Sequence, residues 1–177
     1  CDVELPKTRI VSTGLSFPVL LHMAYDGLGK RGLGNNQEYR DRLERELHLI
    51  KEKGFVDYFA VIEDLMQWAK ARMLCGPGRG SSAGSLVCWC LGITEVDPIA
   101  HGLMFERFID VNRVDLPDVD LDFPSDRRKE AVAYLKEKYG EGRTAQLVNF
   151  NAFRPRAILQ AAARLMGIPP WEVKAAS

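Results

Sequence analysis

The chain has 177 residues, of which 46% are hydrophobic and 27% are charged. This composition is ordinary for a globular protein of about one domain, and it excludes collagen-like, low-complexity and disordered classes. The 24 basic and 24 acidic side chains cancel, so net charge alone indicates no polyanionic partner, and no apolar run approaches the ~20 residues of a membrane span.

The charges are distributed unevenly along the chain. Residues 104–122 carry six acidic and two basic side chains, whereas residues 124–177 carry five acidic and ten basic ones. An acidic cluster followed by a basic tail is typical of a metal site beside a phosphate-binding surface.

Cysteine usage and the first residue bear on localisation. The spacing of Cys1, Cys75, Cys88 and Cys90 matches no zinc site, so we expect buried, reduced thiols in a cytoplasmic protein. The chain opens without an initiator Met or a signal peptide, and we expect it to be a segment of a longer protein.

The first part of the chain is predicted to be a loop followed by helices. Residues 1–36 mix Pro, Gly and short apolar clusters, which indicates a loop-rich lead-in with one helix near Phe17–Leu28. A helix is predicted over residues 37–53, with Arg40–Glu44 and Arg42–Glu46 paired away from its apolar stripe of Tyr39, Leu43, Leu47 and Ile50. The next helix is predicted from an Asp57 cap to Arg72, with Tyr58, Ile62, Leu65 and Ala69 inward.

The second part is predicted to interleave strands and helices. A Gly-rich loop from Gly76 enters a short buried helix over Leu86–Ile93. Strands are predicted at 103–109, 118–123 and 144–150. Helices are predicted from a Ser125 cap to Tyr139, and from Pro155 to Gly167 with Ile158, Leu159, Ala162 and Leu165 as its stripe. The expected fold class is therefore α/β (α+β), a mixed sheet packed with helices around one core.

The most informative motif is PDVDLDF at residues 117–123, in which carboxylates alternate with apolar residues. On a strand this puts Asp118, Asp120 and Asp122 on one face. Like charges there repel one another, and bound divalent cations relieve the repulsion. Mg²⁺ prefers such oxygen ligands, and two ions can promote phosphoryl transfer. The alternative is a solvated acidic edge strand that resists aggregation.

The Gly-rich loop GPGRGSSAGS begins at residue 76. Its glycines allow backbone N–H groups to approach phosphate oxygens, Ser81 and Ser82 add hydroxyl donors, Arg79 adds a planar cation, and the following helix offers its N-terminal dipole. Residues 78–83 also fit the dinucleotide fingerprint, but only three residues are left for the strand that it needs. The lack of Gly-Lys-Ser/Thr excludes a Walker A loop, and a plain flexible turn stays open.

Further arginines surround these motifs. Arg107 and Arg113 precede the aspartates and are placed to reach phosphates, with ion pairing to neighbouring acids as the alternative. A second group of cations comprises Arg127, Arg128, Lys129, Arg154 and Arg156. These side chains are expected either to follow a nucleic-acid backbone or to lie on solvated helix faces. The three histidines form no cluster, and no nucleophile stands beside a base.

Three stretches, GPGRGSSAGSLVCWCLGITEVDP, LMFERFIDVNRVDLPDVDLDFPSDRR and YLKEKYG, resemble the palm region of the bacterial DNA polymerase III alpha subunits, the C-family DNA polymerases. The similarity extends upstream through YRDRLERELHLIKEKGFVDYFAVIEDLMQWAK and downstream through FRPRAILQAAARLMG, and thus covers essentially the whole chain. It implies a polymerase-beta-like nucleotidyltransferase palm over residues 37–177, with residues 1–36 leading into it.

The resemblance also implies roles for individual residues. Asp118 and Asp120 match the catalytic, metal-binding aspartates, and Asp122 matches a third acid that is a further candidate ligand. The segments expected to bind the incoming nucleotide contain Arg79, Gly80, Ser81, Ser82, Arg107 and Arg113. Two Mg²⁺ ions, for which Mn²⁺ can substitute, are the implied cofactors.

The implied function is template-directed nucleotidyl transfer from a deoxynucleoside triphosphate to a primer 3′-hydroxyl in DNA replication. Primer–template DNA is the expected partner, with replisome subunits bound through regions outside this chain and no membrane. The family places a third catalytic aspartate further along than residue 177, so we expect the chain alone to be inactive. The alternatives are a non-catalytic DNA- or nucleotide-binding module and a dinucleotide-dependent oxidoreductase.

Overall fold

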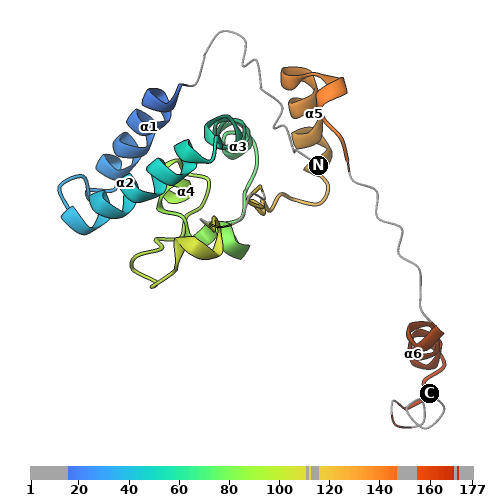
Figure 1. The fold of residues 1–177 in the computed structure, drawn as a ribbon. Coiled ribbons are helices and arrows are strands. Elements are labelled where there is room, and N and C mark those ends of the chain that lie inside the picture. Colours follow the sequence, from blue (N-terminus) through green and yellow to red (C-terminus); the bar gives the residue numbers. More distant parts are fainter. Residues whose placement is uncertain (1–15, 111, 113–115, 147–154, 170, 172–177) are drawn as a thin grey trace. The chain divides into compact units, whose positions relative to one another are not determined.

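The structure is a computed structural model that describes residues 16–110, 112, 116–146, 155–169 and 171. The chain divides into two compact units, Cys1–Thr144 and Ala145–Ser177. The described part of the first unit is built from helices and short 3-10 turns (Figure 1). The second unit is described separately below.

Three helices form the scaffold of the first unit: α1 (Phe17–Lys30), α2 (Gln37–Glu52) and α3 (Val56–Lys70). The Asn36 side chain caps α2 by accepting from the Glu38 N–H. Gly54, at φ +71°, allows the turn into α3 after α2 has ended. The predicted positions of these helices are confirmed, although α3 begins after Phe55, so Asp57 lies in its first turn and is not its cap.

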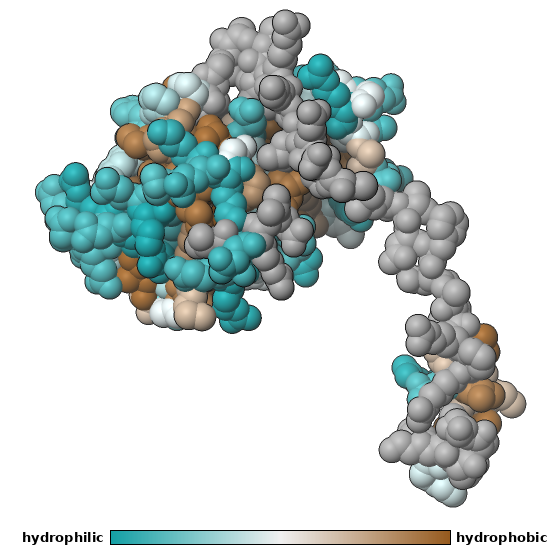
Figure 2. All heavy atoms as spheres, viewed as in Figure 1, coloured by the Kyte–Doolittle hydropathy of each residue, from teal (hydrophilic) through white to brown (hydrophobic). Residues whose placement is uncertain are grey.

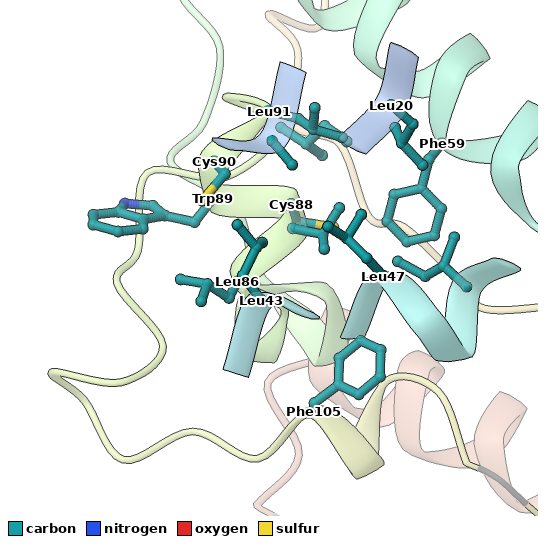
Figure 3. Packing of buried hydrophobic residues seen from close by; sticks show 14 of the residues in the cluster. Leu20, Leu43, Leu47, Phe59, Leu86, Cys88, Trp89, Cys90, Leu91 and Phe105 are labelled. Carbon is teal, nitrogen blue, oxygen red and sulfur yellow. The ribbon is translucent and has the colours of Figure 1, made fainter. Parts of the chain in front are cut away.

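The short helix α4 (Leu86–Cys90) lies at the centre of the core, where it packs against α1 and α2. All five of its residues are buried. Trp89 and Cys88 project to opposite sides of α4, as Figure 3 shows. Cys88 and Cys90 are buried free thiols, as expected, and burial raises the pKa of Cys90 to about 12.

The rest of the first unit consists of 3-10 turns and one longer helix. The turns are η1 (Gly80–Gly84), η2 (Phe105–Arg107) and η3 (Glu141–Arg143), and the helix is α5 (Arg128–Tyr139). Helix α5 packs on α3, where Trp68 and Tyr134 stack with ring centroids 4.6 Å apart. The predicted Ser125 cap is wrong: the Arg127 and Arg128 N–H groups donate to the Pro124 carbonyl, so a turn delays the start of α5 to Arg128.

The second unit contains α6 (Pro155–Leu165), the last predicted helix. Its predicted inward stripe is wrong for this structure, since Ile158, Leu159, Ala162 and Leu165 are exposed. Apolar surface is visible on this unit in Figure 2. Among the described residues of this unit, α6 is the one helical element assigned, so no second helix of the unit itself packs on this face.

The prediction of a mixed sheet is wrong: the described residues form helices and turns and contain no strand. A strand needs a neighbouring strand to satisfy its backbone. Between residues 118–123 and the rest of the described chain, one backbone hydrogen bond is found, from the Gly76 N–H to the Asp122 carbonyl at 3.0 Å. In the 103–109 segment, Phe105–Arg107 turns instead, with Phe108 and Ile109 N–H both donating to Phe105 O. Residues 144–146 form no strand, and 147–150 lie outside the described residues.

The described surface of the first unit is mostly hydrophilic on the face drawn in Figure 2, with small apolar areas between charged side chains. Among the described residues, every helix is too short or too polar to cross a bilayer.

A Gly-rich loop beside an acidic segment

The loop that begins at Gly76 lies directly against the acidic segment 117–123. The Gly76 N–H donates to the Asp122 carbonyl at 3.0 Å, and a Cβ at Gly76 would lie 2.7 Å from Asp122 Cβ. At Gly80, where φ is +66°, a Cβ would lie 2.4 Å from Asp120 Oδ2. Close approach therefore favours glycine at position 76 and the positive φ favours it at position 80, and the two motifs lie side by side although about 40 residues separate them.

The acidic segment alternates between solvent and core as predicted, although it is not a strand. Its three aspartates are exposed, whereas Val119, Leu121 and Phe123 pack against the hydrophobic core. Tyr58 fixes the start of the segment by donating its hydroxyl to the Pro117 carbonyl at 2.5 Å. Burial raises the pKa of Tyr58 to about 12, with the Asp118 charge adding to the effect. Tyr58 was predicted to face the core, and its bond to Pro117 was not predicted.

Arg79 joins the loop to the carboxylates. Its Nε lies 3.1 Å from Asp122 Oδ1, and its Nη2 lies 4.0 Å from Asp120 Oδ1. The guanidinium is 62% exposed, so it is free to change partners at little cost. One cation therefore faces two aspartates, which shows that this face of the segment accommodates positive charge.

The serines of the loop differ in what they offer. Ser82 is fully buried, and its Oγ donates to the Arg79 carbonyl at 3.0 Å, so this hydroxyl shapes the loop. Ser81 is half-buried beside exposed Gly80. Gly80, Ser81 and Arg79 are thus the part of the loop that faces outward near the aspartates.

The expected anion site at the N-terminus of α4 is wrong. The buried Glu46 carboxylate already accepts from the Val87 N–H at 3.1 Å and from Ser85 Oγ at 2.9 Å. Ser85 Oγ in turn accepts from the Cys88 N–H. The first turn of α4 is therefore filled by an internal carboxylate, and a phosphate has no free N–H group there.

The predicted pairing of Glu46 with Arg42 is confirmed, but its predicted position away from the buried face is wrong. The Glu46 side chain is completely buried, and its Oε1 accepts a hydrogen bond from Arg42 Nε at 2.6 Å. Burial raises the pKa of Glu46, while the N–H groups of α4 and Arg42 oppose that rise. The signal was available, because position 46 lies three residues after Leu43 and four before Ile50, on the buried face.

The other arginines and the lysine that were predicted to meet phosphates do not all lie near the loop. Arg107 is exposed in η2, and η2 contacts η1, so this arginine belongs to the same neighbourhood as the loop. Arg113, Arg154 and the side chain of Arg156 lie outside the described residues. Arg127 donates to Glu130 and to the Arg72 carbonyl, so it fixes α5, whereas Arg128 and Lys129 are exposed.

The geometry bears on the dinucleotide-binding alternative and on the metal site. Described residues 71–79 form no strand, so the dinucleotide fingerprint lacks the strand before its first glycine. Within the described part of the chain, no group of three potential ligands could by itself hold a metal ion. Two carboxylates beside a glycine-rich loop do fit Mg²⁺, which commonly takes one or two carboxylates and completes its shell with water and phosphate.

The site thus combines a glycine-rich loop with neighbouring carboxylates, an arrangement whose chemistry suits a phosphate-bearing ligand together with a divalent cation. The comparisons give the family: the model for the "Bacterial DNA polymerase III alpha NTPase domain" matches residues 18–177. The chain belongs to the bacterial DNA polymerase III alpha family.

Individual relatives agree with this assignment. The chain is 41% identical over 170 residues to DNA polymerase III subunit alpha of Aquifex aeolicus, and 47% identical over 179 residues to that of Halalkalibacterium halodurans. These matches cover 93% and 96% of this chain but 15% and 16% of those proteins. The chain therefore spans about one seventh of the length of these relatives.

Proposed function

We propose that this chain supplies the triphosphate-binding loop and two metal-binding carboxylates of a DNA-directed DNA polymerase. The observation that carries the proposal is the contact between the Gly80 backbone and the Asp120 carboxylate, with Arg79 bridging to Asp122. A ligand that bonds to the loop N–H groups lies within reach of a cation on the aspartates. Membership of the polymerase III alpha family supports a deoxynucleoside triphosphate as that ligand and primer–template DNA and replisome subunits as partners.

In this proposal each residue has a separate task. Asp118 and Asp120 hold Mg²⁺, with Asp122 as a further ligand once Arg79 has left it. The Gly80 and Ser81 N–H groups bind phosphate oxygens, and Arg79 and Arg107 neutralise their charge. Bound Mg²⁺ supplies activation of the attacking hydroxyl and stabilisation of the leaving pyrophosphate. The chain's own residues bind and orient the nucleotide for nucleotidyl transfer.

The metal assignment is tested by titrating Mn²⁺ into the wild-type chain, Asp120→Asn and Asp126→Asn. Asp126 is an exposed carboxylate on the same stretch of chain and serves as the matched control. We expect Asp120→Asn to weaken Mn²⁺ binding by about tenfold, the effect of losing one charged ligand, and Asp126→Asn to leave it unchanged. Equal affinity in all three proteins would refute the assignment.

Arg79 allows a sharper test because its two roles oppose each other. Arg79→Gln removes the cation that competes with metal for Asp120 and Asp122, so Mn²⁺ alone should bind about two- to fivefold more tightly. The same variant loses a phosphate partner, so Mn²⁺–deoxynucleoside triphosphate should bind more weakly. Changes in the same direction would contradict the proposed geometry. Nucleotide binding that needs no metal would favour a non-catalytic binding module.

A further inference from the structure

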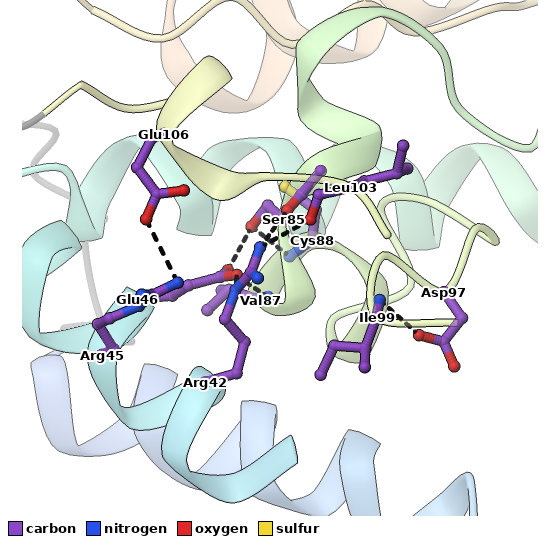
Figure 4. A network of polar contacts seen from close by, with 11 residues as sticks. Arg42, Arg45, Glu46, Ser85, Val87, Cys88, Asp97, Ile99, Leu103 and Glu106 are labelled. Carbon is purple, nitrogen blue, oxygen red and sulfur yellow. Dashed lines mark hydrogen bonds and ion pairs between the residues drawn. The ribbon is translucent and has the colours of Figure 1, made fainter. Parts of the chain in front are cut away.

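Helix α2 carries a buried ion pair that contacts both segments proposed to face the triphosphate. Arg42 and Glu46 lie one turn apart, with Arg42 Nε 2.6 Å from Glu46 Oε1, and the Glu46 side chain is fully buried (Figure 4). The Arg42 side chain is only 16% exposed. The pair is thus different in kind from the solvated i,i+4 pair Asp26–Lys30 of α1, whose side chains are 50% and 76% exposed.

On one side, the pair holds the Gly-rich loop. Glu46 Oε2 accepts from Ser85 Oγ at 2.9 Å, and Arg42 Nη2 donates to the Gly84 carbonyl at 3.0 Å. The bonds continue inside the loop, because the Ser85 N–H donates to Ser82 O at 3.1 Å and Ser82 Oγ donates to Arg79 O at 3.0 Å. A connected series of hydrogen bonds therefore runs from α2 to the residue that bridges the aspartates.

On the other side, α2 holds the approach to η2. The same Arg42 Nη2 donates to the Leu103 carbonyl at 3.3 Å, and Arg45 Nη2 lies 3.3 Å from Glu106 Oε1 (Figure 4). The two held segments also touch each other, since a Cβ at Gly84 would lie 2.6 Å from Met104 O. Arg42 thus bonds to the backbones of both segments within one turn of their contact.

A buried ion pair stabilises a core less than apolar side chains of similar size do. Removing two charges from water costs more than their attraction returns unless every polar group is bonded, and an apolar pair of similar size would pack as well. Hydrogen bonds are directional, whereas apolar contacts are not. The bonds from this pair to other segments end on the loop, on α4 and on the Leu103 carbonyl, so they specify one arrangement of these segments.

We propose that Arg42 and Glu46 are positioning residues, which fix the loop Gly80–Gly84 and the turn Phe105–Arg107 on α2 so that both face one bound triphosphate. This inference rests on the proposed function for its ligand. Neither side chain is placed to touch the nucleotide. The pair acts through the loop and the turn, whereas the backbone of the aspartate segment is held separately by Gly76 and Tyr58.

The first test measures amide hydrogen exchange in the full 177-residue chain, in Glu46→Gln, Arg42→Lys and the control Asp26→Asn. The Gln oxygen can serve Arg42 or Val87 but not both, while the shape of the residue is kept. We expect exchange at Ser85, Val87 and Phe108 to be faster by about tenfold or more in the first two variants, with α3 unchanged. Uniform acceleration that includes α3, or no acceleration at all, would overturn the inference.

The second test separates positioning from binding chemistry. Glu46→Gln should weaken Mn²⁺–deoxynucleoside triphosphate binding by about tenfold and should not weaken binding of Mn²⁺ alone. Arg42→Lys should weaken triphosphate binding less, because one donor is kept. A merely structural role would lower both affinities together, which would overturn the inference. If the wild-type chain binds no triphosphate, the proposed function fails instead, and the exchange experiment alone decides whether the pair orders the two segments.

Discussion

Two glycines of α1 should respond to the same substitution with opposite signs. A Cβ at Gly27 would lie 1.9 Å from the Cys90 carbonyl oxygen of α4, whereas a Cβ at Gly29 would meet no atom within 4 Å. Both residues are helical. Gly27→Ala and Gly29→Ala therefore both gain helix propensity, but only the new methyl group at position 27 would collide with α4.

The magnitudes decide the outcome. Replacing a helical Gly with Ala stabilises by up to ~1 kcal/mol, less near a helix end. At Gly27 the new methyl group must be accommodated by moving α1 or α4 by at least about 1 Å, because Cβ contacts under 3.0 Å essentially never occur. Overpacking of this kind costs about 1–3 kcal/mol and sometimes more. Gly27→Ala should thus destabilise by about 1–2 kcal/mol net, while Gly29→Ala stabilises slightly.

Urea unfolding followed by circular dichroism at 222 nm measures both variants against wild type. A change of 1 kcal/mol also moves the melting temperature by about 2–4 °C in a chain of this size. We expect Gly27→Ala to melt lower than wild type and Gly29→Ala to melt at the same temperature or higher. Stabilisation by Gly27→Ala would show that α1 and α4 are not in backbone contact, and the packing described for the core would be wrong.

Two further predictions concern residues that anchor other parts of the first unit. Burial would raise the pKa of Asp64, but bonds from Lys138, Tyr139 and Tyr134 outweigh it and hold that pKa below its usual range. Asp64 thus stabilises the fold above pH 3.8, and this contribution is lost as pH falls through the lowered pKa. Asp64→Asn should lower the free energy of unfolding at pH 7 by about 1–3 kcal/mol, measured by urea unfolding. On acidification this variant should lose less stability than the wild type, and an equal loss in both proteins would contradict the prediction. Because the pKa of Tyr58 is raised to about 12, its share of the stability is complete below pH 10 and falls as pH rises from 10 to 12. Tyr58→Phe should therefore lose less stability over that range in the same assay, and identical pH profiles would place this hydroxyl in solvent.

The helices were predictable from sequence because their signals are local. Gln37–Glu52 and Val56–Lys70 have apolar stripes at helical spacing, and these residues are buried in the structure. The strands were not predictable in the same way, since alternation at 118–123 correctly gave which side chains face solvent but said nothing of a pairing partner. Period two indicates an extended segment, and a sheet needs a second one beside it.

The candidate site, too, was predictable where its signals are local and not where they depend on packing. The Gly-rich loop and the aspartates were identified by residue type, and their contact confirms that they belong together, while their roles stay predictions. The pairing of Arg42 with Glu46 was predicted, but its burial was missed, because paired charges at i,i+4 usually face solvent even where one of them shares a helix face with apolar residues. Sequence periodicity locates a face, but it does not show which charged residue on that face is enclosed.

The shortness of α4 has a consequence for the order in which the molecule folds. Five residues are too few to form a helix alone, because the nucleus costs more than one turn returns. Helix α4 therefore forms only when α1 and α2, whose residues lie some 35 to 70 positions earlier, are in place to receive it. The Gly-rich loop ends where α4 begins, so it becomes ordered in the same late, non-local step. An intermediate with α1, α2 and α3 already helical would have no assembled loop and no binding site.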